Sequence, residues 1–490
     1  MTTLRPRTPY TEAELATLYP PHLQLQQVQI LLRHGERTPI SARFKNTGLP
    51  AYWPYCTAAK NLTNAVLTQE GGGFETLAWR RKLETLDPKN GGAPALARGP
   101  EGEAENICMP GELTDKGRET TLALGRRLRG LYVERLGFLP ERFEGGGTVG
   151  LRSTVIPRAL ESVLQVFSGL YPKGLRDGAS VPEVVMRGIA DETLFPNEAG
   201  CKRFGQLAAG FAARAAGRWN ESEEMGVVEK GIGKWMPEGV RVEGRPRLSG
   251  VMDTINATLA HGQGTKLPKE FYEDGVMRNV DRICTDEWFG GYQESKEYRR
   301  LGIGGLVGDV TQRMVEHVSG RTVVEEGKGR RFRMGLAGCH DTTIAATLAS
   351  LGAFDVAKDT WPKYTSSIAF ELFQKRPATN STASSVMKDS SPTRPSLLSP
   401  RTPLASLPAS AREHLNDYYV RLRYNDHPVT LPYCRQSPDR HLEGDPSFCT
   451  LAAFKAAADE VTPADWKREC GERLGEPAVP EVVERVLGMD

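Results

Sequence analysis

The sequence predicts an α/β protein, built as a three-layer, doubly wound, mostly parallel sheet with an inserted helical cap domain. Two observations predict this architecture. First, three apolar segments of strand length run into Arg or His side chains, at residues 28–32, 148–151 and 331–337. Buried strands with such ends are typical of open α/β sheets, which bind ligands at their carboxyl edge. Second, residues 195–318 show helical patterns with few strand signals, which indicates a helical insertion.

Length and composition bound the possibilities. A chain of 490 residues is expected to form about two to four domains. With 39% hydrophobic residues, 25% charged residues and a net charge of +2, it offers no argument for a nucleic-acid partner. No apolar run reaches the roughly 18 residues of a membrane span, so no transmembrane segment is expected. None of these features predicts the oligomeric state.

Residues 1–25 are predicted to be a lead-in to the sheet. They contain Arg5 and Arg7 but no apolar core of a secretory signal peptide. Pro6 and Pro9 weaken an amphipathic helix of the transit-peptide kind. We therefore expect an intracellular protein, mitochondrial or cytoplasmic, that is not secreted.

The first part of the α/β core is predicted at residues 26–190. Its first strand ends in Arg33, His34, Gly35 and Arg37. The two guanidinium groups match phosphate oxygens, and a neutral imidazole between them is a competent nucleophile. Gly35 would let the backbone come close to a ligand. This stretch therefore suggests phosphoryl chemistry, although so short a motif also arises by chance.

The rest of this first part contains a long irregular segment and two strand–helix units. Residues 44–110 are rich in Gly, Asn and Pro and are interpreted as a lid or pocket wall. A helix is predicted from an N-cap at Thr114 to a C′ residue at Gly137. A further strand ends at Arg152, a helix opens at Pro157, and residues 184–189 are a strand candidate.

The inserted cap domain is placed at residues 191–325 and the second part of the core at residues 326–490. There a strand runs into His340 and Asp341 and is followed by a helix that stops at Gly352. Residues 366–373 and 417–424 alternate like two paired strands. The Ser, Pro and Thr-rich residues 375–411 between them are predicted to be a disordered hairpin insertion.

Strand ends of a parallel sheet meet at one edge, so Arg33, His34, Arg152 and His340-Asp341 are expected to converge. With these motifs the chain resembles the histidine acid phosphatases, which have the phosphoglycerate mutase-like fold. The matching segments are Arg33-His-Gly-Glu-Arg-Thr-Pro39, Arg152-Ser-Thr154 and His340-Asp341, with Gly111–Thr114 and Gly169–Pro172 in support. The resemblance extends from about residue 28 to residue 470.

Within that family the chain is most similar to the lysophosphatidic acid phosphatase branch. The segments that carry this similarity are residues 194–201, 351–354, 449–454 and 462–470. That branch is mitochondrial, in agreement with the missing signal peptide. The 375–411 insertion and much of the helical region depart from it, and substrate selection would lie in that region.

The resemblance implies a role for each motif residue. His34 would be the nucleophile that forms a phosphohistidine, and Asp341 would protonate the leaving alkoxide. The phosphoryl oxygens would be bound by Arg33, Arg37, Arg152 and His340. The nearby guanidinium groups should lower the pKa of His34 and keep it neutral in acid.

Some of these residues also allow plainer interpretations. His340 is compatible with an ordinary core histidine, and Asp341 with a helix cap. Arg158 is a second candidate phosphate ligand, but we prefer an ion pair with Glu161 or Glu192.

The eight cysteines form no zinc-type cluster, so no metal or other cofactor is expected. Relatives of this family carry a disulfide where Cys434 and Cys449 lie. In a reducing compartment we expect thiols instead.

The preferred function is an acid phosphatase for small phosphate monoesters, with lysophosphatidic acid or related lipid phosphates as the expected class. Aromatic residues of the lid segment favour a lipid-like substrate, namely Tyr52, Trp53, Tyr55 and Trp79. One alternative is a phosphatase or phytase-like enzyme for soluble or inositol phosphates. Another is an inactive protein that binds a phosphate ligand. A mutase or bisphosphatase of this fold is disfavoured because those relatives lack an Asp directly after the second His.

Overall fold

The computed structural model describes residues 8–69, 71–87, 91–145, 147–178, 181–319, 332–376 and 402–489. Its strands are β1 Leu23–Arg33, β2 Leu62–Leu67, β3 Phe74–Trp79, β4 Glu84–Asp87, β5 Ala93–Leu96, β6 Val149–Ser153, β7 Val184–Val185, β8 Met334–Cys339, β9 Ser367–Lys375, β10 Tyr418–Tyr424, β11 His427–Val429, β12 His441–Leu442 and β13 Asp445–Thr450. Its helices are α1 Glu12–Leu18, α2 Asp115–Leu128, α3 Pro157–Leu170, α4 Lys202–Trp219, α5 Glu223–Ile232, α6 Leu248–Ala260, α7 Asp274–Glu294, α8 Lys296–Arg299, α9 Gly305–Val318, α10 Asp341–Ser350, α11 Ala409–Leu415, α12 Pro432–Arg435, α13 Leu451–Val461 and α14 Trp466–Glu469.

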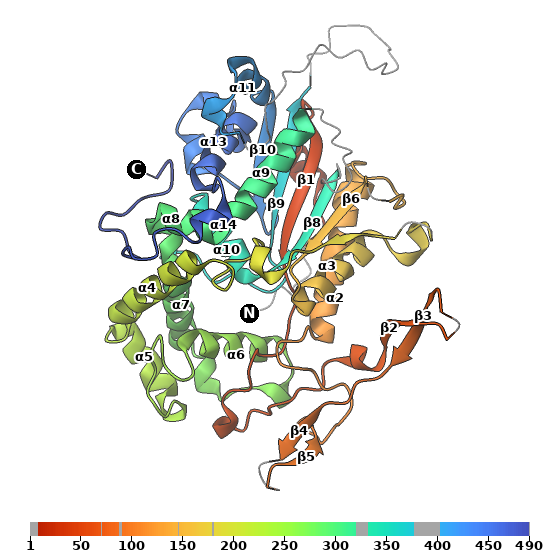
Figure 1. Cartoon of the computed structure of the whole chain (residues 1–490), viewed down its shortest axis with the longest axis vertical. Coiled ribbons are helices and arrows are strands. Elements are labelled where there is room, and N and C mark those ends of the chain that lie inside the picture. Colours follow the sequence, from red (N-terminus) through yellow and green to blue (C-terminus); the bar gives the residue numbers. More distant parts are fainter. Residues whose placement is uncertain are drawn as a thin grey trace.

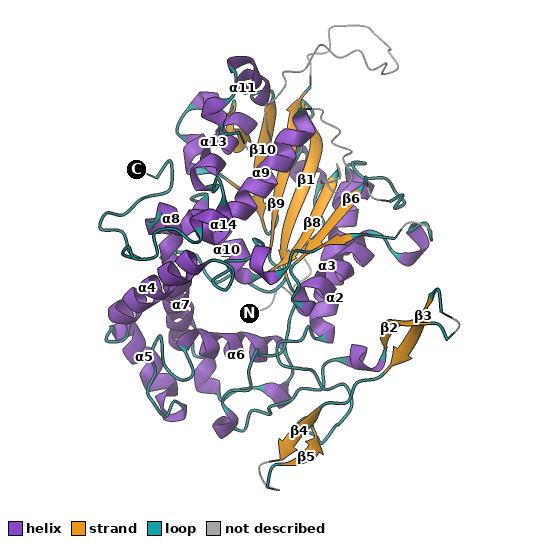
Figure 2. Ribbon diagram, viewed as in Figure 1, coloured by secondary structure: helices purple, strands orange, loops and turns teal. Residues whose placement is uncertain are grey.

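A nine-stranded sheet forms the centre of the molecule, in the order β12-β13-β10-β9-β1-β8-β6-β7, with β11 paired to β10 (Figure 2). The pairs β1–β8, β8–β6 and β6–β7 are parallel. From β9 outward the strands pair antiparallel. The predicted α/β fold is confirmed. The three strands that end in the motif residues, β1, β6 and β8, all belong to the parallel half of the sheet. This half therefore positions the site.

Both faces of the sheet are covered by helices, which explains the continuous apolar character of β1. Val28, Ile30 and Leu32 pack with the helices α2 and α3. Leu31 points to the other face and belongs to the cluster that includes α9, α10 and α13. Successive strand residues point to opposite faces, so a strand buried on both sides has no polar face to show in the sequence.

Most predicted elements are present with shifted ends. Thr114 caps α2, and its side chain accepts a hydrogen bond from the Gly117 N–H. The chain then continues as a π-helix, Arg129–Arg135, and Gly137 has a φ of +57° as expected for a C′ residue. The predicted strand at residues 184–189 is only β7, which is two residues long. Those two residues pair with Leu151 and Arg152, and the chain then leaves the sheet.

The lead-in is more ordered than the sequence suggested. It contains α1, and β1 begins at Leu23, within the predicted lead-in and five residues ahead of the predicted strand. Tyr19 donates a 2.6 Å hydrogen bond to Glu371, a fully buried carboxylate in β9. Glu371 also accepts from Arg421 of β10 and lies near Arg423. This buried network fastens the lead-in to the antiparallel half of the sheet.

Two features extend from the sheet at the end that carries the motifs (Figure 1). The helices α4, α5, α6 and α7 form a lobe below this end, which corresponds to the predicted helical insertion. The long segment before α2 forms two hairpins, β2–β3 and β4–β5, which project away from the body. Trp79, one of the aromatic residues of the predicted lid, lies on the first of these hairpins and is 41% exposed.

The insertion between β9 and β10 lies partly outside the described residues, which resume at residue 402. The prediction of disorder is wrong for its last part. Leu404–Ser406 form a 3₁₀ helix, and α11 begins at Ala409. Leu407 and Ala411 are buried and belong to the cluster that includes α13. These few apolar residues supply the burial that the composition of the whole segment appeared to lack.

The structure also corrects the expectation of thiols. Three disulfides join Cys56 to Cys108, Cys201 to Cys470 and Cys434 to Cys449. Disulfides persist in oxidising compartments, so the premise of a reducing environment loses its support. The intracellular location stays a prediction. Across the described part of the chain, none of the helices has both the length and the apolar character that a membrane crossing requires.

Candidate active site

Three parallel strand ends bring the predicted residues to one edge of the sheet. Arg33 at the end of β1 pairs in register with Cys339 at the end of β8. Ser153 at the end of β6 pairs with Gly338. His34 and His340 are therefore the first residues beyond two neighbouring strands, and their ring centroids lie 5.6 Å apart.

The main chain of His34 is fixed on both sides. Its N–H donates to the Cys339 carbonyl at 3.1 Å, and its carbonyl accepts from the Thr365 N–H at 3.2 Å. Its ring Nδ1 lies 2.8 Å from the Gly35 carbonyl oxygen. A carbonyl can only accept, so Nδ1 carries the proton and Nε2 of the neutral ring keeps its lone pair.

Burial lowers the pKa of His34 well below 6.5, and the charge of Arg158 is the next cause, ahead of Arg33 and Arg37. The same two leading causes, burial and Arg158, lower the pKa of His340 to about 3. Both imidazoles are thus neutral at mildly acidic pH. His340 Nε2 lies 3.2 Å from the Thr154 hydroxyl, just beyond β6.

Gly35 has a packing role that the sequence did not predict. A Cβ at this position would lie 2.3 Å from the Gly117 carbonyl oxygen in α2. A Cβ at Gly117 would lie 2.1 Å from the Glu36 carbonyl oxygen. The two glycines therefore allow the loop after β1 to touch the first turn of α2.

Arg33 and Asp341 form an ion pair across the site, with Nη2 and Oδ2 2.6 Å apart. Asp341 also accepts from Trp361 Nε1 at 3.0 Å and from the Thr342 N–H at 2.9 Å. Burial alone would raise the pKa of Asp341, but Arg33 and the Trp361 hydrogen bond outweigh it and lower the pKa to about 2. The α10 helix begins at Asp341 itself and its N-cap is His340, so Asp341 is not the cap.

Arg37 is bound by the helical lobe. Its Nη1 lies 2.6 Å from Oδ1 of Asp253 in α6 and donates to the Thr38 carbonyl at 3.0 Å. The ring centroid of Tyr364 lies close to both arginines of the motif, 4.2 Å from the Arg33 guanidinium carbon and 5.9 Å from that of Arg37.

The ion pairs of the two remaining arginines, Arg152 and Arg158, differ from those that the sequence suggested. Arg152 lies 2.8 Å from Glu192 and 3.3 Å from Asp309, so both of its terminal nitrogens face carboxylates. Arg158 was expected to pair with Glu161 or Glu192, but Glu161 pairs with Arg118 and Glu192 with Arg152. Arg158 has no carboxylate within 4.0 Å among the described residues, and it is the charge that most affects both histidines.

Sequence reasoning missed residues 361–366, the loop between α10 and β9. The loop contacts the site through Trp361 on Asp341, the Pro362 carbonyl on Arg33 at 2.6 Å, and the Tyr364 ring. Thr365 has a φ of +61°, which is rare for a β-branched residue and marks a strained backbone. The strain accompanies the hydrogen bond from its N–H to His34.

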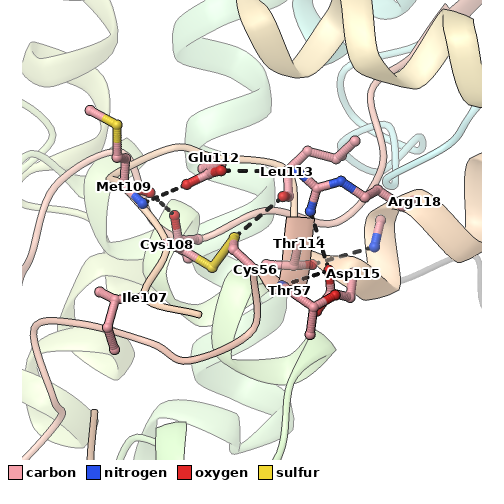
Figure 3. The surroundings of a disulfide bond; sticks show 12 residues. Cys56, Thr57, Ile107, Cys108, Met109, Glu112, Leu113, Thr114, Asp115 and Arg118 are labelled. Carbon is pink, nitrogen blue, oxygen red and sulfur yellow. Dashed lines mark hydrogen bonds and ion pairs between the residues drawn. A yellow bond between two sulfur atoms is a disulfide. The ribbon is translucent and has the colours of Figure 1, made fainter. Parts of the chain in front are cut away.

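A disulfide supports the other side of the motif loop (Figure 3). The bond between Cys56 and Cys108 joins the two ends of the segment that contains both hairpins. Cys108 is followed by Met109 and Glu112, which bind the loop after β1. The Thr38 hydroxyl donates to the Met109 carbonyl at 2.8 Å, and the Thr38 N–H to the Glu112 carbonyl at 3.1 Å. Glu112 and the two sulfurs lie close together, but the sulfurs are bonded to each other and not available to a metal.

Comparison with known proteins agrees with this geometry. The family profile of the histidine phosphatase superfamily (branch 2) matches residues 24–425, which include all three motifs. The chain belongs to this family. The expected enzyme class, a phosphatase of the histidine type, is thereby confirmed. The family match covers β1, β6 and β8, the three strands whose ends form the site.

Two relatives illustrate the range of similarity. A probable acid phosphatase of Schizosaccharomyces pombe is 36% identical over 465 residues, which covers 92% of this chain and 95% of the relative. Lysophosphatidic acid phosphatase type 6 of Bos taurus is 25% identical over 370 residues, covering 72% of this chain and 75% of the relative. The predicted resemblance to that branch is therefore present, at lower identity than to the yeast protein.

Solved structures share the fold at low sequence identity. The multiple inositol polyphosphate phosphatase of Bifidobacterium longum superimposes with a TM-score of 0.53 at 11% identity, covering 95% of this chain and 98% of that one. A phytase of Hafnia alvei gives a TM-score of 0.52 at 12% identity, covering 92% and 99%. At such identities the likeness concerns the fold alone.

Proposed function

We propose that the enzyme is an acid phosphatase that hydrolyses phosphate monoesters through a phosphohistidine on His34, with Asp341 as the proton donor. The observation that carries this proposal is the hydrogen bond from Nδ1 of His34 to the Gly35 carbonyl. It leaves Nε2 unprotonated, between arginines, at the end of a buried strand. A nucleophile held in this way needs no separate base.

Three arginines would bind the phosphoryl oxygens. Arg33 and Arg37 flank the nucleophile, and we assign the third position to Arg158 in place of Arg152. The charge of Arg158 lowers the pKa of both histidines more than any other charge does. Arg152, in contrast, is paired with Glu192 and Asp309. Donors fixed before the reaction stabilise the charge that develops on the transferred group. His340 completes the ring of groups around the phosphorus, on the side of Thr154.

The first chemical step forms a bond from His34 Nε2 to phosphorus and breaks the bond from phosphorus to the leaving oxygen, which takes its proton from Asp341. In the second step water attacks the phosphorus, Asp341 accepts the water proton, and the imidazole departs. In the unliganded site Arg33 keeps Asp341 ionised. A bound phosphoryl group attracts the arginines to its own oxygens and adds negative charge, and both effects raise the pKa of Asp341.

Replacing Asp341 by Asn tests this step through the leaving group. The variant keeps the size and the acceptor for Thr342 but cannot transfer a proton. We expect kcat/KM to fall by about 10²–10⁴-fold on an alkyl phosphate, whose alkoxide needs the proton. On nitrophenyl phosphate the loss should be much smaller. Equal losses on both substrates would mean that Asp341 positions the site and does not donate.

The pH dependence of kcat/KM tests the neutral nucleophile. An ordinary histidine with a pKa of about 6.5 would be protonated and inactive below that pH. Because the pKa of His34 is lowered, its imidazole stays neutral, and activity corrected for substrate ionisation should persist well below pH 6.5. In an Arg158→Ala variant the acid limb should move to higher pH, since a repelling charge is gone. An acid limb near 6.5 in the wild type would contradict the assignment.

Lipid-like monoesters are the proposed substrate class. Three large apolar side chains beside the motifs are exposed, namely Ile40 at 48%, Met109 at 46% and Val155 at 41%. Phe195 packs edge-on against His340. Such a rim suits an aliphatic leaving group. The aromatic residues first suggested for this purpose contribute less, because Trp53 is buried and Tyr55 stacks on His261.

A further inference from the structure

One carboxylate of the helical lobe is built into the loop that carries the catalytic motif. Asp253 lies in α6, and its side chain is only 9% exposed. Three groups of the loop after β1 face it: Arg37 at 2.6 Å, Arg43 at 3.1 Å and the N–H of Ile40 at 3.1 Å. A single acid from the lobe therefore neutralises an arginine of the phosphate site and fixes the loop beyond it.

The packing of α6 shows that this arrangement is specific. A Cβ at Gly250 would lie 2.8 Å from Arg43 Nε, so a larger residue at this position would push the Arg43 side chain away from its place against the helix. At the other end of α6, Nε2 of His261 forms a 2.9 Å hydrogen bond with the hydroxyl of Thr114, which lies at the start of α2. The helix is thus fastened to the motif loop through Asp253 and to the start of α2 through His261.

The balance of charge decides what the site can hold. Arg33, Arg37, Arg43 and Arg158 supply four positive charges, and Asp341 and Asp253 supply two negative ones. Both histidines of the site are neutral. One phosphoryl group can bind to Arg33, Arg37 and Arg158 together. Arg43 is the next cation along the loop, and it is already paired with Asp253.

We propose that Asp253 is a positioning and specificity-determining residue, which orients Arg37 toward a single phosphoryl group and excludes substrates with a second phosphate nearby. A second phosphate on this side would approach a buried carboxylate whose counter-ions are already engaged. Repulsion between like charges is strong where water is scarce. This inference rests on the proposed phosphatase function and names a residue that would make the enzyme prefer substrates with a single phosphate.

The test compares one-phosphate and two-phosphate ligands on the intact enzyme. Asp253→Asn keeps the shape and an acceptor for the Ile40 N–H but removes the charge. We expect its ratio of kcat/KM for glycerol 1-phosphate over a glycerol bisphosphate to fall on the order of ten- to hundredfold. Asp253→Glu keeps the charge and should keep the discrimination, even if its rate is lower.

A matched control lies in the same lobe. Asp286 is also 9% exposed and also binds an arginine, Arg218, at 3.0 Å, with a further hydrogen bond from Trp219. Asp286→Asn removes a comparable buried charge away from the motif loop, so it should leave the ratio unchanged. A purely structural effect of Asp253 would lower the rate on both substrates equally.

Binding measurements separate this inference from the proposed function. Inorganic phosphate and pyrophosphate can be titrated into the folded protein without turnover. The wild type should bind phosphate more tightly than pyrophosphate. In the Asp253→Asn variant the difference between these two affinities should become smaller or change sign. If the Asn variant does not fold, Asp253→Ser removes the charge with a smaller side chain. An unchanged phosphate-to-pyrophosphate ratio in a folded, uncharged variant would overturn the inference, whether or not the enzyme hydrolyses monoesters.

Discussion

Replacing His34 by Ala will abolish turnover of phosphate monoesters, with a loss on the order of 10⁴-fold or more, as expected when a covalent nucleophile is removed. The expectation follows from the position of Nε2. Nδ1 is tied to the Gly35 carbonyl and the neighbouring His340 is held against Thr154. No other neutral imidazole near His34 in the described part of the site is free to take its place. The measurement is the steady-state rate on an aryl and an alkyl phosphate.

Folding and binding must be shown to survive this substitution. His34 is 1% exposed, so the control is needed even though the residue lies in a loop. The three arginines remain in the variant, which should therefore still bind inorganic phosphate. Phosphate binding without turnover would separate the loss of the nucleophile from the loss of the pocket. Substantial residual turnover would show that another residue attacks the phosphorus.

Exchanging the two candidate arginines for Ala should give opposite results. Arg158→Ala should lower kcat/KM by about 10²–10³-fold, the usual effect of removing one fixed charge from a transition state, and should change the melting temperature little. Arg152→Ala should mainly destabilise the fold, by about 3–5 kcal/mol, because it leaves the buried Glu192 without its counter-ion, whereas Asp309 keeps Arg187 at 2.7 Å. The measurements are kinetics and thermal melting of both variants.

These outcomes also test the assignment itself. If Arg152→Ala retains stability and loses activity while Arg158→Ala is nearly normal, the sequence motif would describe the site better than the ion pairs do. The comparison is well controlled, because the two residues lie six positions apart on the same strand–helix unit.

The sequence predicts the site's position well, because parallel strand ends must meet at one edge. The positions of His34 and His340 could therefore be predicted from the local strand pattern alone. The choice between Arg152 and Arg158 as the third phosphate ligand depends instead on contacts between distant parts of the chain. Arg152 ends a strand, as the motif requires, but Glu192 and Asp309 that hold it come from distant segments. Arg158 lies in the first turn of α3, so only the packing of that helix places it near His34.

Long-range contacts also explain what was missed. The loop of Trp361, Pro362 and Tyr364 has no motif, and its purpose appears only when Arg33 and Asp341 lie beside it. Asp253 was overlooked for the same reason, since it reaches the motif from another part of the fold. The end of the 375–411 segment was misjudged because an average composition hides a few well-placed apolar residues.

The central claim is a covalent phosphohistidine on His34, and trapping it is the most direct test. Enzyme mixed with a substrate labelled in its phosphoryl group and quenched rapidly in alkali should carry label on the peptide that contains His34. That label should be stable in base, lost in acid and missing from the His34→Ala variant. A wild-type enzyme that turns over but never carries label, or carries an acid-stable label on another residue, would contradict the account.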